Sequence, residues 1–189
     1  AISTNGTGQA NPFLNSGSFS RIDVAGDSVA SAGSTGLAPT HAMLTNSGRL
    51  YIANSGDDTI SVSALTATTQ GTTINLVQLC DSLGCPPITP IFVNSTEANR
   101  VYVADAGNGS ISVIDTSLNV VANTFAVSPA NVGSPLPSPD RVSQPIALAE
   151  LPNGTKIYSA NQGTNSVSSI NTQDGTINRV ISLSAAPVW

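Results

Sequence analysis

Hydrophobic and polar residues alternate along three stretches of the chain, and one phrase recurs in all three. Each copy begins with a basic residue, an aliphatic residue and a Tyr, and it ends with Ala followed by Asn or Asp: Arg49–Asn54, Arg100–Asp105 and Lys156–Asn161. A second alternating segment begins five residues after each copy, at Thr59, Ser110 and Ser166. Alternation with period two is typical of β-strands, so each phrase predicts a strand pair.

A Pro precedes each strand pair, at Pro39, Pro90 and Pro145, and these units repeat every fifty or so residues (roughly the length of a four-stranded blade). We therefore predict four strands per unit. The expected strands are 40–45, 49–54, 59–65 and 73–79 in the first unit, 90–94, 100–104, 110–115 and 119–127 in the second, and 145–150, 156–161, 166–171 and 176–183 in the third.

Both ends of the chain carry fragments of the same unit. Ser18–Asp23 aligns with Ser110–Asp115, residues 1–5 align with a second strand, and Ala186–Trp189 aligns with a first strand. The expected division of the single domain or segment 1–189 is a partial unit 1–35, three units at 36–79, 90–127 and 145–184, and the start of a first strand at 185–189. The ends could meet in one small ring. We favour their coverage by more chain or by neighbouring subunits, because an exposed sheet edge invites pairing.

The repeated phrase, with the following Ser-Val-Ile-Asp of Ser112–Asp115, resembles the YVTN-type β-propeller repeat. The resemblance implies an all-β fold, a radial array of four-stranded antiparallel blades, of which this chain would hold three and most of a fourth. It also implies kinship with surface-layer proteins, secreted propellers, lactonases and periplasmic redox enzymes. Asp105, Ser159 and the greater unit length depart from the pattern.

The repeat residues have structural interpretations. We expect Tyr51, Tyr102 and Tyr158 to pack between units, with sugar binding as the alternative. We expect Asn54, Asp105 and Asn161 to satisfy backbone amides where a strand enters a turn, with a ligand-binding ring as the alternative. His41 is interpreted as structural. Asp57 and Asp58 lack the alternating oxygen ligands of a calcium loop.

Two cysteines, Cys80 and Cys85, are separated by four residues that include a Gly. We expect them to form a local disulfide, which would place the protein outside the reducing cytosol. A zinc site would need further soft ligands, and the chain has no other Cys and a single His. Glycosylation motifs of the type Asn-x-Ser/Thr occur at Asn5, Asn94, Asn108 and Asn153.

Three long segments interrupt the units: 6–17, 80–89 and 128–144. The first follows a second strand, and the other two follow fourth strands. Antiparallel strands alternate in direction, so all three segments are expected on one face. Long loops on a rigid scaffold commonly serve binding or assembly.

Composition narrows the function. Charged residues are 9% and aromatics 4% of the chain, the net charge is −5, and no basic patch favours nucleic acid. No transmembrane segment, catalytic motif or cofactor motif is expected. We interpret the chain as an extracellular, cell-surface or periplasmic structural or interaction module, more plausibly not an enzyme, with protein partners or self-association. The alternatives are a segment of a secreted lactonase-like or redox-like enzyme and a carbohydrate-binding lectin.

Overall fold

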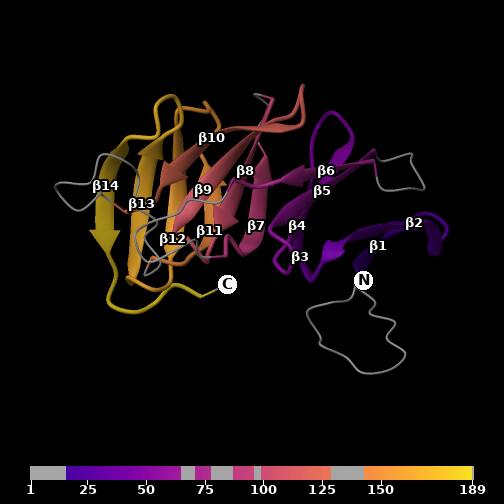
Figure 1. Cartoon of the computed structure of the whole chain (residues 1–189), viewed down its shortest axis with the longest axis horizontal. Coiled ribbons are helices and arrows are strands. Elements are labelled where there is room, and N and C mark those ends of the chain that lie inside the picture. The colour runs from indigo at the N-terminus through magenta and orange to yellow at the C-terminus, as the bar shows by residue number, and fades with distance from the viewer. Residues whose placement is uncertain (1–15, 65–70, 78–86, 96–98, 129–142, 189) are drawn as a thin grey trace.

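The chain folds into successive antiparallel β-sheets that pack face to face (Figure 1). The computed structural model describes residues 16–64, 71–77, 87–95, 99–128 and 143–188. Within them a hairpin, formed by β1 (Ser16–Asp23) and β2 (Ser28–Leu37), is followed by three sheets of four strands each. The first sheet contains β3 (Pro39–Leu44), β4 (Arg49–Asn54), β5 (Thr59–Ala64) and β6 (Thr72–Asn75). The second contains β7 (Pro90–Ser95), β8 (Arg100–Asp105), β9 (Ser110–Asp115) and β10 (Val120–Ala126). The third contains β11 (Pro145–Glu150), β12 (Lys156–Asn161), β13 (Ser166–Asn171) and β14 (Ile177–Ser182).

In all three sheets each strand pairs with the next strand of the sequence. The second and third strands of each unit were predicted to within a residue, because each is a short apolar or alternating segment bounded by turn residues. The largest difference is β6, which ends at Asn75 and not at residue 79. Leu76 and Val77 lie outside the strand, and Leu76 turns into the core, where it is 8% exposed.

The hairpin β1–β2 corresponds to the third and fourth strands of a unit. Its register contains a bulge between Arg21 and Ile22, and the pairs β9–β10 and β13–β14 each contain one at the same step of the unit. First strands carry a bulge too, immediately after the opening Pro39, Pro90 and Pro145. A bulge fixes strand register, so its recurrence shows that the units are structural repeats.

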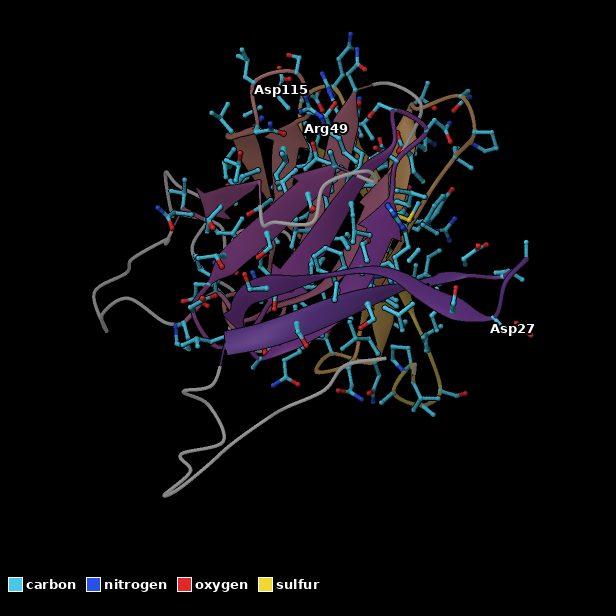
Figure 2. The ribbon with its side chains drawn as sticks, turned by 90° about the vertical axis from the view of Figure 1, so that its right-hand side faces the viewer. Asp27, Arg49 and Asp115 are labelled. Carbon is cyan, nitrogen blue, oxygen red and sulfur yellow. The ribbon has the colours of Figure 1, made fainter. Side chains whose placement is uncertain are left out.

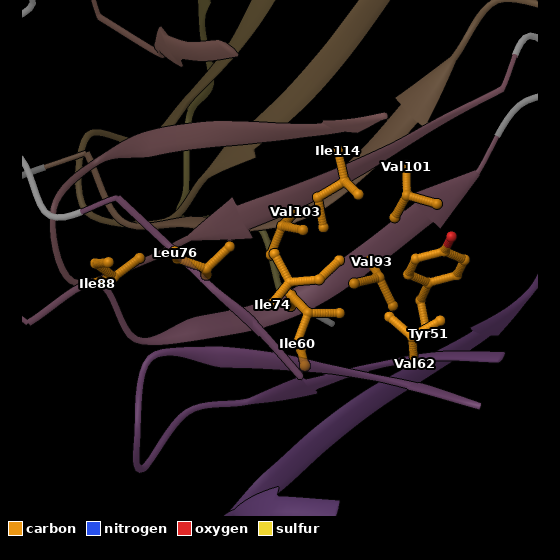
Figure 3. Close-up of a cluster of buried hydrophobic side chains, with 11 residues drawn as sticks. Tyr51, Ile60, Val62, Ile74, Leu76, Ile88, Val93, Val101, Val103 and Ile114 are labelled. Atoms are coloured by element: carbon orange, nitrogen blue, oxygen red, sulfur yellow. The ribbon is translucent and has the colours of Figure 1, made fainter. Parts of the chain in front are cut away.

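The core lies between neighbouring sheets. Between the first and second sheets, Tyr51 and Ile60 meet Val103 and Ile114, and all four are completely buried (Figure 3). A second cluster joins the second sheet to the third through residues such as Phe92, Tyr102, Ile111, Ile157 and Ile170. The middle strands of the first and second sheets are therefore buried on both faces, which explains their density of β-branched residues. Each fully buried aliphatic side chain contributes about 1.5–3 kcal/mol of transfer free energy.

The two ends of this succession of sheets are far apart. β14 and the hairpin β1–β2 lie at opposite ends of the molecule (Figure 1). Residues 1–5, predicted as a second strand, lie outside the described residues. Residues 186–188 are described and form no strand, and Trp189 again lies outside. In the described parts of the chain no helix is long and apolar enough to cross a bilayer.

Candidate interaction face

A buried polar group occurs where the second strand of each sheet ends. In the first sheet, the Asn54 side-chain amide donates hydrogen bonds to the hydroxyl of Thr59, at 3.0 Å, and to that of Ser61, at 2.9 Å. In the third sheet, Asn161 makes the same pair of bonds to Ser166, at 3.3 Å, and Ser168, at 2.8 Å. These partners lie on the adjacent third strand, so the side chain holds the two strands together above their turn.

Asp105 occupies this position in the second sheet. Its Oδ2 accepts hydrogen bonds from the Ser110 hydroxyl, at 3.1 Å, and the Ser112 hydroxyl, at 2.7 Å. The side chain is 0% exposed, and its Oδ1 has no hydrogen-bond partner. Burial raises the pKa of Asp105 to about 8, and the two serine hydroxyls only partly oppose that rise. The carboxyl group is therefore mainly protonated at neutral pH.

The sequence-based expectation for these three residues needs a correction. Their side chains were predicted to satisfy backbone amides, but the bonds common to all three sheets go to hydroxyls of the third strand, and Asp105 interacts in addition with the backbone of Ser112. The reason is register: Asn54 pairs with Thr59, and Ser61 lies two residues further along that strand. All three residues are buried, which does not favour a ligand-binding ring.

Hydrogen bonds from backbone amides are accepted by Asp57 and Asp58, which lie in the turn between β4 and β5. Asp57 accepts a hydrogen bond from the Leu37 amide at 2.9 Å, and Asp58 accepts one from the Thr89 amide at 2.8 Å. Both bonds join neighbouring units of the chain. These carboxylates are thus engaged in joining units. Within the described ranges, no group of three or more His, Cys, Asp or Glu side chains could hold a metal ion.

The turns between second and third strands, which follow β4, β8 and β12, gather at one end of the strands. We call this end of the sheets the loop edge. Backbone bonds join these turns to the residues that precede each first strand: Gly56 to Leu37 at 3.0 Å, Gly107 to Ile88 at 2.9 Å, and Gly163 to Ser143 at 3.0 Å. Ile88 and Ser143 are the described ends of the long segments 80–89 and 128–144. The segments themselves, like most of 6–17, lie outside the described residues.

The opposite edge, which we call the turn edge, contains contacts that the sequence analysis missed. The Arg49 guanidinium donates to the Thr116 carbonyl, at 2.9 Å, and to Asn119 Oδ1, at 3.1 Å. The Tyr51 hydroxyl also donates to Asn119 Oδ1, at 2.9 Å. Figure 2 shows Arg49 beside the turn that contains Asp115. The sequence signal that could have predicted these contacts is the basic residue that opens each repeated phrase.

Arg100 repeats this arrangement between the second and third sheets, where it donates to the Thr172 carbonyl at 3.0 Å. Shallow hollows of about 300 and 440 Å³ lie around it, lined by polar residues that include Asp115, Lys156 and Gln173. Tyr102 is 1% exposed and lies between the sheets, whereas Tyr158 is partly exposed. Tyr51 and Tyr102 are therefore too deeply buried to bind a sugar.

His41 lies on the innermost strand of the first sheet. Its ring stacks on Phe92 of the second sheet, with ring centroids 4.2 Å apart. Burial lowers the pKa of His41, and its Nδ1 accepts a hydrogen bond of 3.4 Å from the Val93 amide. The neutral ring thus serves packing between sheets. Among the glycosylation motifs, Asn153 is exposed, Asn108 is fully buried, and Asn5 is not described. Cys80 and Cys85 also lie outside the described residues.

The comparisons with known proteins show the fold. No family model and no curated protein sequence matches the chain. Among solved structures, the hydrazine synthase of Kuenenia stuttgartiensis is 18% identical with a TM-score of 0.67, over 88% of this chain and 42% of that one. The WD40 β-propeller domain of Doa1 is 16% identical with a TM-score of 0.57, over 80% and 43%.

A putative 6-phosphogluconolactonase of Bacteroides fragilis is 16% identical with a TM-score of 0.62, over 96% of this chain and 53% of that chain. The chain therefore spans about half the length of each of these three structures. At such low identity the similarity concerns architecture. Together with the four-stranded antiparallel sheets, it shows that the chain has an all-β fold built from β-propeller blades.

Proposed function

We propose that this chain belongs to an extracellular or cell-surface β-propeller that acts as a structural or interaction module, with binding or assembly at the loop edge. One observation carries the proposal. The described ends of the long segments 80–89 and 128–144 meet the same edge, beside the tight turns between second and third strands. Long loops clustered on one edge of a rigid scaffold form a natural binding surface.

The scaffold beneath that edge is rigid for a physical reason. The buried groups around Asn54, Asp105 and Asn161 tie adjacent strands together, and Asp57 and Asp58 tie neighbouring units together. A charge-assisted hydrogen bond to a backbone amide contributes about 1.5–3 kcal/mol. Loops anchored on such a frame lose little conformational freedom at their ends when a partner binds, which favours affinity.

The extracellular location rests on the composition, on the resemblance to YVTN-type repeats and on the expected bond between Cys80 and Cys85. Mass spectrometry of the chain without reductant tests the last of these. We expect the peptide that contains both cysteines to be two hydrogens lighter than its dithiol form. Quantitative alkylation of both thiols in the native protein would argue against the disulfide and would remove this support for an oxidising compartment.

A loop replacement tests the binding role. The chain is immobilised and exposed to surface and secreted proteins of its native host, and captured proteins are quantified by mass spectrometry. The test variant replaces residues 130–141 with a short Gly-Ser linker, and the matched control is Asp174→Lys in an exposed turn on the turn edge. We expect capture to survive in the control and to fall in the loop variant. Equal capture by both variants would overturn the proposal.

A second candidate function is a segment of a secreted enzyme. It is favoured by the fold similarity to a putative 6-phosphogluconolactonase, of which this chain spans 53%. Asp105 is sealed from solvent and cannot act on a substrate. This alternative assigns the catalytic groups to parts of the protein outside this chain. Lactone hydrolysis by the native protein that contains this chain, abolished by substitutions outside residues 1–189, would favour this alternative.

A further inference from the structure

Two interfaces between neighbouring sheets are described, one between the first and second sheets and one between the second and third. We call them joints, and they are built in the same way. At the first joint, Arg49 and Tyr51 of one sheet contact Asn119 in the last turn of the next sheet. Below them, Tyr51 packs in the same cluster as Ile114 of the second sheet, with Val121 against it. At the second joint, Arg100 reaches the equivalent turn, and Ile170 and Ile177 take the places of Ile114 and Val121.

The third sheet presents the same face without a neighbour among the described residues. Lys156 and Tyr158 stand where Arg49 and Tyr51 stand in the first sheet, and both are only partly buried. Ile181 on β14 is 42% exposed, and Leu183, immediately after that strand, is 37% exposed. The equivalent residues of the second sheet are Phe125, at 4%, and Val127, at 0%. This open face therefore carries the same kinds of residue, at the same positions, as the faces that form the two described joints.

The hairpin β1–β2 presents the complementary half of a joint at the other end of the molecule. Its register places Ile22 and Val29 at the positions of Ile114 and Val121, yet Ile22 is 56% exposed and Val29 is 65% exposed. Asp27 occupies the position of Asn119, with the same left-handed backbone conformation, at φ 46° against 54°. Asp27 lies at the tip of the hairpin, well away from the three sheets (Figure 2).

We infer that the hairpin β1–β2 of one copy docks on the open face of the third sheet in a second copy. In this contact Lys156 meets Asp27, an ion pair in place of the Arg49–Asn119 hydrogen bond. The Tyr158 hydroxyl donates to the same carboxylate, as that of Tyr51 does to Asn119. Ile22 and Val29 cover Ile181 and Leu183.

Two observations identify a second copy as the occupant. The charges are complementary: the pair Arg49–Asn119 of the first joint corresponds, between the two exposed ends, to the oppositely charged pair Lys156–Asp27. The contact also continues a geometry that the chain already uses twice. It joins two different surfaces, so it is head-to-tail and closes into a ring or extends as a filament, depending on the rotation between copies. It does not involve the loop edge and is independent of the function proposed there.

Charge reversal in the chain of residues 1–189 tests the inference, with sedimentation velocity measured over a concentration series. We expect the wild-type chain to associate, more weakly at high salt. Asp27→Lys and Lys156→Asp should each weaken association about tenfold, since like charges then face each other. The double variant should restore association. Asp174→Lys, an acidic residue in the equivalent turn of the third sheet, is the matched control and should leave association unchanged.

A second variant tests the apolar part of the contact. Ile181→Arg changes an exposed side chain, so the fold should persist by circular dichroism while association is lost. The inference is overturned if the wild-type chain stays monomeric throughout, if the double variant does not recover, or if Asp174→Lys weakens association equally. Loss of association only on replacing residues 130–141 would also overturn it, because self-assembly would then occur at the loop edge.

Discussion

Asp105→Asn tests the chemistry of the buried polar groups most directly. Asn already occupies this position in the first and third sheets, at Asn54 and Asn161, and there its amide donates to two hydroxyls. The substitution is nearly isosteric: it removes the capacity to ionise and puts an amide that donates to the two hydroxyls in place of the oxygen that accepts from them. We expect it to stabilise the protein at neutral pH and to have little effect near pH 4.

The magnitude follows from the pKa of Asp105, which is about 8 in the folded chain and about 4 when unfolded. Between these values the unfolded chain releases a proton that the folded chain retains. The contribution of Asp105 to stability is therefore complete below about pH 4, falls by at most about 1.4 kcal/mol per pH unit, and is lost by about pH 8. At pH 7 the accumulated loss is at most about 4 kcal/mol.

Urea unfolding of both proteins between pH 4 and pH 8 measures this effect. The difference in unfolding free energy should rise with pH in favour of Asp105→Asn, while all other titrating groups cancel between the two proteins. Asp174→Asn serves as a control, because Asp174 is exposed and its hydrogen bonds to Thr176 lower its pKa. Its effect should therefore stay constant above pH 5. An equal difference at pH 4 and pH 7 for Asp105→Asn would refute the reasoning.

Three further substitutions test the joints and turns by denaturant unfolding. Tyr51→Phe removes the hydroxyl bonded to Asn119 and should cost about 1 kcal/mol; no loss would show that this bond is dispensable. Ile114→Ala opens a cavity between the first and second sheets and should cost about 2–5 kcal/mol; a cost below 1 kcal/mol would contradict close packing there. Gly175 and Gly48 both have positive φ, at 72° and 76°, so Ala is strained at either site. Gly175→Ala should destabilise the protein more than Gly48→Ala, because only at Gly175 would the added Cβ collide with another side chain, that of Phe125. Equal costs would show that the ring moves aside.

Strand positions could be predicted because they depend on local pattern. The phrases at Arg49–Asn54 and Arg100–Asp105 are short apolar runs between a basic residue and a turn, and their strands form where expected. The fourth strands were less certain, because they lie outermost and are largely exposed. β14, for example, has five exposed residues out of six, so its sequence is only weakly constrained by burial.

The contacts that join the sheets could not be predicted from the local pattern. Arg49 and its partner Thr116 lie 67 residues apart, and nothing between them in the sequence signals the contact. The role of Asp105 was predicted only in part, for a different reason. Its partners, Ser110 and Ser112, were visible in the sequence, but choosing them over backbone amides requires the register of β8 and β9. Burial then gives this carboxyl a pKa that no sequence motif indicates.

The recurrence of the same joint has a consequence for how such a protein can change in evolution. A unit copied in tandem within the gene would bring both halves of a joint with it, so a newly inserted unit would find matching surfaces on either side. Stability in such arrays is close to a sum over units and their nearest-neighbour interfaces. The number of units can thus grow or shrink without the invention of a new interface, while differences between units, such as Asp105 against Asn54 and Asn161, can arise separately in each copy.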